Sequence, residues 1–258
     1  YEFLLKCIMD LMSLFLIFII GFFSAIIGIT VGSSDFIRIP LLVMLGLPPK
    51  VAVASNKVGA ILKNIVGIYK YGKTKHINSK LGFLLVIFEF IGAIIGAKIL
   101  LNINDSIIGK VVAIALFIVV ILTLLKKNLG VKKKEKISKK KLLIGVILFF
   151  LLSIFKGAIG GTGIFQTYIL ATLFGLTFLE CAGTRRIPNL ISALTSVFIF
   201  SFHKIINWEV GIVLLISEGL GAYVGATLAL KKGNKFVRRL FITVGIILSI
   251  VVLYNSFI

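Results

Sequence analysis

The chain consists of long apolar blocks separated by short polar segments. Six blocks are almost free of charge: Leu11–Ile29, Leu81–Leu101, Ile107–Leu125, Leu142–Phe155, Val210–Leu230 and Leu240–Phe257. Most approach the roughly 20 residues with which a helix crosses a bilayer. In hydrocarbon the backbone must satisfy its own hydrogen bonds, and the period-two alternation of barrel strands is absent. The pattern therefore predicts an all-α polytopic membrane protein.

Composition supports this prediction and narrows the possible chemistry. Hydrophobic residues make up 59% of the chain and charged residues 15%, with a mean hydropathy of +1.13, whereas soluble domains carry roughly a quarter charged residues. The two cysteines lack the paired spacing of a disulfide framework or a zinc site, and no nucleophile–base pair or nucleotide P-loop is evident. We expect no catalytic residue, no metal and no cofactor.

The formal net charge of +20 is concentrated in short segments. Nine of the 29 basic residues lie in Lys126–Lys141, and others lie in Lys70–Lys80 and Lys231–Arg239. Basic residues in short loops mark the cytoplasmic side of a membrane protein. No nucleic-acid-reading module accompanies the charge, so we expect lipid and a small solute as partners, and no nucleic acid.

The chain contains two copies of one unit. A shift of 129 residues aligns Ser24–Leu101 with Ser153–Leu230 without a gap, and 19 of the 78 aligned positions are identical. Apolar composition alone would rarely align the six glycine pairs among them: Gly28/Gly157, Gly32/Gly161, Gly46/Gly175, Gly82/Gly211, Gly92/Gly221 and Gly96/Gly225.

Charge indicates that the copies have opposite orientations. In the first copy the loop Lys70–Lys80 is basic and the next loop, Asn102–Ser106, is not; in the second copy Phe202–Glu209 is nearly neutral and Lys231–Arg239 holds five basic residues. Inverted repeats of this kind occur in many secondary transporters. We predict an N-terminal repeat over residues 1–126, a basic cytoplasmic linker over 127–140, and an inverted C-terminal repeat over 141–258. Both termini would lie outside the cell, in a multi-pass protein of the plasma membrane.

Each copy begins with a helix that does not cross the membrane in one piece. The segments Phe36–Leu45 and Phe165–Phe174 hold only about ten apolar residues and follow small polar turns. A long helix, a break and a half-length helix make a V-shaped hairpin, after which three transmembrane helices would follow in each copy. Irregular backbone at membrane depth is tolerated where it is buried or lines a cavity, so the two breaks indicate a binding site.

The helix after each hairpin, Val51–Tyr69 and Ala182–Phe200, carries charge inside the apolar region, and the shift pairs Lys57 with Arg186. Intramembrane cations are costly and usually have a partner or a task. Two of them facing open half-helix N-termini favour an anion. We predict substrate contacts from both hairpin breaks and both helices: Gly32, Ser33, Ser34, Asn56, Lys57, Gly161, Thr162, Gly163, Arg185, Arg186 and Asn189.

The alternative for Lys57 and Arg186 is that they pair with the symmetry-related Glu89 and Glu218 or extend to a membrane interface. The glutamates lie in the middle of apolar helices, just before glycines spaced for close helix packing. They are candidates either for salt bridges or for proton coupling. A buried carboxylate takes up a proton more readily once an anion neutralises the cation beside it.

The breaks and charged positions described above are similar to those of the sulfite exporter TauE/SafE family, which the sequence resembles over about residues 10 to 257. The most specific pieces are Ala54-Ser55-Asn56-Lys57 after Gly46, and Gly157 through Asn189 with the break Gly160-Gly161-Thr162-Gly163. The first break, Gly32-Ser33-Ser34-Asp35, has fewer glycines than is usual, and Glu218 stands where the family pattern suggests Gln.

The resemblance implies export of sulfite or a small organosulfonate. We therefore predict a secondary transporter that moves a small sulfur-containing anion by alternating access, with protons as a possible coupling ion. An anion channel on the same fold is the main alternative, and a membrane-embedded enzyme or receptor is a weaker one.

Overall fold

The computed structural model describes residues 11–102, 130 and 138–257, with the side chains of the last ten left out. The predicted span Ile107–Leu125 and most of the predicted linker lie outside these residues. What is described is helical, without a strand: α1 (Leu11–Gly28), α2 (Asp35–Met44), α3 (Pro49–Lys73), α4 (Ser79–Asn102), α6 (Lys139–Ala158), α7 (Gly163–Thr172), α8 (Phe178–Thr184), α9 (Arg186–Phe202) and α10 (Trp208–Phe257).

Five of the described helices are long and apolar enough to cross a membrane, namely α1, α3, α4, α6 and α10. Large apolar side chains on their outer faces are exposed, among them Phe83, Leu143 and Ile216. Charged side chains are instead buried inside, including Arg38, Arg186 and Glu218. An apolar exterior around a polar interior confirms the prediction of a polytopic α-helical membrane protein.

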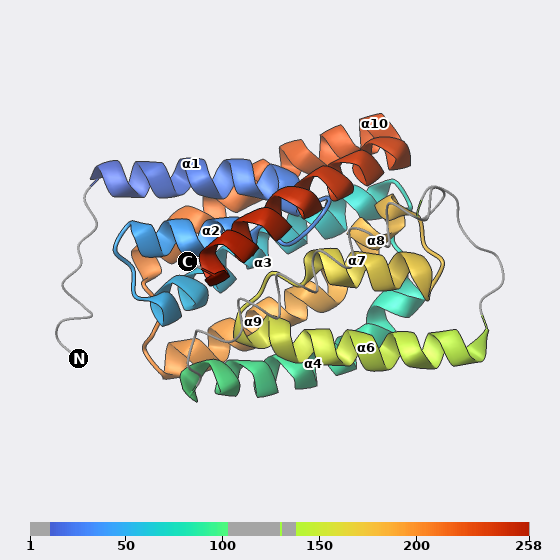
Figure 1. The fold of residues 1–258 in the computed structure, drawn as a ribbon, viewed down its shortest axis with the longest axis horizontal. Coiled ribbons are helices and arrows are strands. Elements are labelled where there is room, and N and C mark those ends of the chain that lie inside the picture. Colours follow the sequence, from blue (N-terminus) through green and yellow to red (C-terminus); the bar gives the residue numbers. More distant parts are fainter. Residues whose placement is uncertain (1–10, 103–129, 131–137, 258) are drawn as a thin grey trace.

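Each half of the chain contains the predicted broken hairpin. The half-length helices α2 and α7 have ten residues each, and the breaks before them depend on left-handed backbone. Gly32 (φ 90°) and Ser33 (φ 61°) form the first turn, and Gly160 (φ 92°) and Gly161 (φ 74°) form the second. Three of these four residues are glycine because other side chains rarely adopt positive φ. Both breaks lie near the middle of the bundle's length (Figure 1).

The two halves are interleaved. Helix α1 packs against α10 and α6 packs against α4, while α3 contacts α10 and α4 contacts α9. Glycines make the first two contacts close. A Cβ at Gly92 or Gly96 would meet the backbone of α6, and one at Gly221 or Gly225 would meet the backbone of α1. These glycines therefore serve helix packing, as their spacing predicts.

Figure 1 also shows how the helices run along the long axis of the bundle. The α3–α4 turn, the start of α6 and the bend of α10 lie at one end. The start of α1, the end of α4 and the α9–α10 turn lie at the other end (Figure 1). The three basic segments, as far as they are described, therefore share one end of the molecule. Helices α1 and α6 run in opposite directions.

The structure corrects two predicted boundaries. The single helix expected over Ala182–Phe200 is divided at Arg185 into α8 and α9. Pro188 causes this division, because it has no N–H to offer the carbonyl of Thr184 and its ring crowds the preceding turn. The segment Lys231–Arg239, expected as a loop, is helical except at Gly233. With φ 76° and ψ −177°, this one glycine reverses the chain inside α10 and removes the need for a loop.

Candidate anion-binding cavity

A cavity of about 50 Å³ lies where the two breaks meet α3 and α9. Its lining is mostly polar and contains five cations: Lys57, Lys63, Lys156, Arg185 and Arg186. Asp35 is the one acid among the described lining residues. Roughly 10–15 Å³ of such free space is enough for one water molecule, so the cavity has room for a small polar solute.

All eleven residues predicted to contact substrate line this cavity. The first break and α3 contribute Gly32, Ser33, Ser34, Asn56 and Lys57, and the second half contributes Gly161, Thr162, Gly163, Arg185, Arg186 and Asn189. The structure thus brings together residues that the sequence separates by more than a hundred positions. That they bind a substrate remains a prediction.

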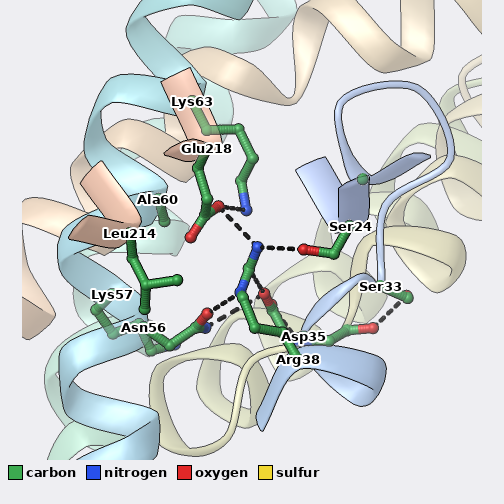
Figure 2. Close-up of polar contacts among 12 residues, drawn as sticks. Ser24, Ser33, Asp35, Arg38, Asn56, Lys57, Ala60, Lys63, Leu214 and Glu218 are labelled. Carbon is green, nitrogen blue, oxygen red and sulfur yellow. Dashed lines mark hydrogen bonds and ion pairs between the residues drawn. The ribbon is translucent and has the colours of Figure 1, made fainter. Parts of the chain in front are cut away.

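Glu218 is neutralised by two cations, neither of which is Lys57 or Arg186. Its carboxylate Oε2 lies 2.5 Å from Lys63 Nζ and 3.1 Å from Arg38 Nη1 (Figure 2). Arg38 Nη2 also bonds Asp35 Oδ1 at 2.7 Å. Arg38 and Glu218 are fully buried. Removal of either partner from such a pair is strongly destabilising.

Glu89 has a different set of partners. Lys156 Nζ lies 2.7 Å from its Oε1, and the Ser153 hydroxyl donates to its Oε2 at 2.6 Å. Lys156 also donates to Asn189 Oδ1, so this pair extends from the buried glutamate to the cavity wall. Gln166 Nε2 completes the group at 3.4 Å from Glu89 Oε2.

The alternative that Lys57 and Arg186 pair with Glu89 and Glu218 is therefore wrong. In the part of the chain that the structure describes, Lys57 and Arg186 form no ion pair with a carboxylate. Extension to a membrane interface is wrong as well, because the two residues are only 4% and 1% exposed. The partners of the glutamates are Lys156 for Glu89, and Lys63 and Arg38 for Glu218. None of these cations has a basic counterpart in the other repeat, so a comparison of the repeats does not reveal them.

Instead, Lys57, Arg185 and Arg186 bind backbone carbonyls at the ends of the hairpin helices. Arg186 Nη2 donates to Gly28 O at 3.1 Å and to Ile29 O at 2.5 Å, and Arg185 Nη2 donates to Thr30 O at 3.0 Å. Lys57 Nζ donates to Lys156 O in the last turn of α6. The C-terminal end of a helix carries partial negative charge. These contacts offset part of the cost of burying the cations, but they leave their full charge in the cavity wall.

Several lining atoms have no hydrogen-bond partner among the described residues. They are Arg185 Nε, Thr162 Oγ1 and Gln166 Oε1, and all three residues are buried. Buried polar groups are nearly always hydrogen-bonded in folded proteins. The cavity wall therefore offers three buried polar atoms that a polar solute can bind.

The N-terminal end of α7 is not open, contrary to the prediction. Asp35 Oδ2 accepts a hydrogen bond from Gly161 N at 2.8 Å, and Ser33 Oγ accepts one from Ile164 N at 2.9 Å. The N-cap residue Thr162 makes no capping bond with its own side chain. The first break thus caps the helix of the second break.

Sequence reasoning missed three charged residues of the cavity: Asp35, Lys63 and Lys156. In the repeat alignment Lys63 is aligned with Ser192, and Lys156 with Ile27. A search for cations present in both repeats therefore does not find them. A better signal was available for Lys156, because it is a lone cation at the end of an apolar block and directly precedes a glycine-rich break.

Irregular backbone and buried cations at the middle of a polytopic helical protein are typical of secondary transporters. The chain belongs to the sulfite exporter TauE/SafE family, which its sequence matches over residues 13–252. The resemblance seen in the motifs is thereby confirmed.

Three curated relatives of similar length are described as probable membrane transporter proteins. One from Haemophilus influenzae, described as a probable membrane transporter protein, is 26% identical over 96% of each chain. A second from a Sinorhizobium species is 25% identical over 91% of this chain and 90% of its own. The Escherichia coli K12 protein YfcA, also described as a probable membrane transporter, is 23% identical over 93% and 89%. No solved structure matches the chain.

Proposed function

We propose that this membrane transporter exports a small sulfur-containing anion, sulfite or an organosulfonate, by alternating access. The observation that carries the proposal is the cavity between the two hairpin breaks. Of the five cations that line it, Lys63 and Lys156 are paired with buried glutamates, which leaves Lys57, Arg185 and Arg186 without a carboxylate partner among the described residues. Arg185 Nε and Thr162 Oγ1 are buried there, also without a hydrogen-bond partner in the described part of the chain. An oxyanion supplies acceptors for N–H and O–H donors and offsets the excess positive charge.

The size of the cavity favours the smaller members of this substrate class. The free space of about 50 Å³ is that of a small solute, so a compact inorganic oxyanion is the first candidate. The family name, sulfite exporter, also favours a small inorganic oxyanion.

Alternating access would come from the motion of one repeat against the other. The proposed repeats are residues 1–126 and 141–258, joined by 127–140. Two features support an inverted relation between them: α1 and α6 run in opposite directions (Figure 1), and the pairing of α1 with α10 has its counterpart in the pairing of α6 with α4.

The proposed orientation follows from charge. The three basic segments share one end of the bundle (Figure 1), and the positive-inside rule assigns that end to the cytoplasm. The linker would then be cytoplasmic and both termini external, in the plasma membrane.

Proton coupling through Glu218, or through Glu89 as the second candidate, remains part of the proposal. Each glutamate contacts a lysine of the cavity wall, Lys63 for Glu218 and Lys156 for Glu89. An anion that attracts the lysine would weaken its hold on the carboxylate, which could then take up a proton.

Uptake into proteoliposomes tests the function directly. We expect the purified protein to accumulate sulfite and, more slowly, short organosulfonates, with chloride and a cationic solute as controls. The measurement is repeated with and without a pH gradient. Failure to move any anion of the panel would contradict the proposal, and a large voltage-dependent current would favour a channel.

A further inference from the structure

The Asp35 carboxylate is held by groups of the kind that would bind a substrate anion. Oδ1 accepts from Arg38 Nη2 at 2.7 Å and from Asn56 Nδ2 at 3.3 Å, while Oδ2 accepts from Gly161 N at 2.8 Å. These donors are a guanidinium, an amide and the backbone N–H of Gly161 in the turn before α7, which are groups that bind carboxylates and oxyanions alike.

Its position differs from that of the other two acids. Glu89 and Glu218 have fully buried side chains behind their lysines, whereas the side chain of Asp35 is 21% exposed. Asp35 lines the cavity and neither glutamate does. A solute in the cavity can therefore reach this carboxylate directly.

The charges facing Asp35 come from several elements. Besides Arg38 on its own helix, the cavity wall presents Lys57 and Lys63 from α3, Lys156 from α6, Arg185 beside α8 and Arg186 of α9. The second break offers no acid in return, because Ile164 is the repeat counterpart of Asp35. Asp35 is thus the one internal anion, among the described residues, in a site built for anions.

We propose that Asp35 is an internal competitor for the anion site, and that a substrate anion binds by displacing its carboxylate from Gly161 N and Asn56. This inference rests on the proposed function and adds a residue that sets the affinity. Displacement would also break one of the hydrogen bonds between the two breaks, the one from Gly161 N to Asp35, while the bond from Ile164 N to Ser33 Oγ stays. Occupation of the site would then weaken the contact between the repeats without removing it.

Asp35→Asn tests the inference. The amide keeps the shape but removes the competing charge, so sulfite should bind about ten- to a hundred-fold more tightly, the range of one charge-assisted hydrogen bond. Binding is measured by titration calorimetry on the purified full chain at constant ionic strength. The variant should fold, because Arg38 keeps Glu218 at 3.1 Å and its bond to Asn56. If it does not, Asp35→Ser removes the same charge with a smaller side chain.

Asp35→Glu is the matched control, because it retains the charge and should show no gain. An equal or lower affinity in the neutral variants, with sulfite still bound by the parent, overturns the inference and leaves the proposed function intact. An equal gain in Asp35→Glu also overturns it, since charge would not be the cause. If neither the parent nor the variants bind sulfite or a short sulfonate, the proposed function fails and the inference with it.

Discussion

Lys57 and Lys50 lie on the same helix and make the same kind of contact at different places. Lys57 Nζ donates to a carbonyl in the last turn of α6, at the cavity, and Lys50 Nζ donates to Leu101 O near the end of α4, at 2.7 Å. Lys50 does not line the cavity. Comparison of substitutions at Lys50 and Lys57 therefore separates the effect of a lysine that binds a helix end from the effect of a cation at the cavity.

We expect Lys57→Gln to weaken anion binding about ten- to a hundred-fold, because one charge-assisted contact is worth about 1.5–3 kcal/mol. Lys50→Gln should leave binding unchanged. Titration of both variants with sulfite measures the difference. Equal behaviour of the two would mean that Lys57 only holds the end of α6.

Arg186→Gln should also lose affinity, but it removes more than a charge. Its guanidinium holds Gly28 O, Ile29 O and, at 3.1 Å, Asn64 Oδ1. We therefore expect a clear fall in thermal stability together with the loss of binding, as measured by thermal unfolding in detergent. A variant as stable as its parent would show that these three bonds contribute little.

Glu218→Gln is expected to destabilise the protein by about 3 kcal/mol, since it leaves Lys63 and Arg38 with less compensating charge in a buried setting. The thermal midpoint measures this effect. A stable variant that binds the anion normally but has lost its response to a pH gradient would instead support the proton role. The same assay on Glu89→Gln tests the second candidate.

The sequence predicted the members of the site better than their partners. Repeat alignment identified Lys57 and Arg186 because both copies carry a cation there. It could not identify Lys63 or Lys156, because these break the symmetry, and it could not show that Asp35 reaches the opposite break. Pairing between helices depends on their rotation and depth, and hydrophobic blocks without a clear polar face carry little information on either.

At the scale of elements, the glycines of α4 and α10 set the distance between helices. A Cβ on Gly96 would collide with the backbone of Ile154 and Ala158, and neither can move as a flexible side chain could. The half-length helices α2 and α7 were predicted well, because the left-handed turns before them require glycine and these glycines can be seen in the sequence. The division at Arg185 and the single-residue bend at Gly233 were harder to foresee, because one residue causes each.

We expect Gly96→Ala to cost about 1–3 kcal/mol through overpacking. Gly72→Ala is the control: its Cβ would lie 3.7 Å from the nearest side-chain atom, Ile77 Cδ1. Because alanine favours helix, that variant should be neutral or slightly more stable. Chemical denaturation in mixed micelles compares the two, and equal midpoints would argue against close packing of α4 on α6.

At the scale of the whole molecule, the orientation of the repeats can be tested by labelling. Asn102 is the last residue of α4 and Lys231 lies just before the bend of α10, and both are exposed. The end of α4 and the bend of α10 lie at opposite ends of the bundle (Figure 1). In a background with Cys7 replaced, a membrane-impermeant thiol reagent should reach Asn102→Cys from outside and Lys231→Cys only after the cells are opened. Modification of both from the same side would contradict the inverted arrangement.

The interleaved pairing of α1 with α10 and of α4 with α6 also has a consequence for biosynthesis. Helix α1 finds its main packing partner, α10, only when the last described helix has been made. Until α6, α9 and α10 have followed, α3 holds Lys57, Lys63 and Asn64 in the bilayer without their respective partners, which are Lys156 O, Glu218 and Arg186. Nascent chains stalled in the middle should therefore be substrates for membrane quality-control proteases, and two separately translated halves should accumulate only when they are produced together.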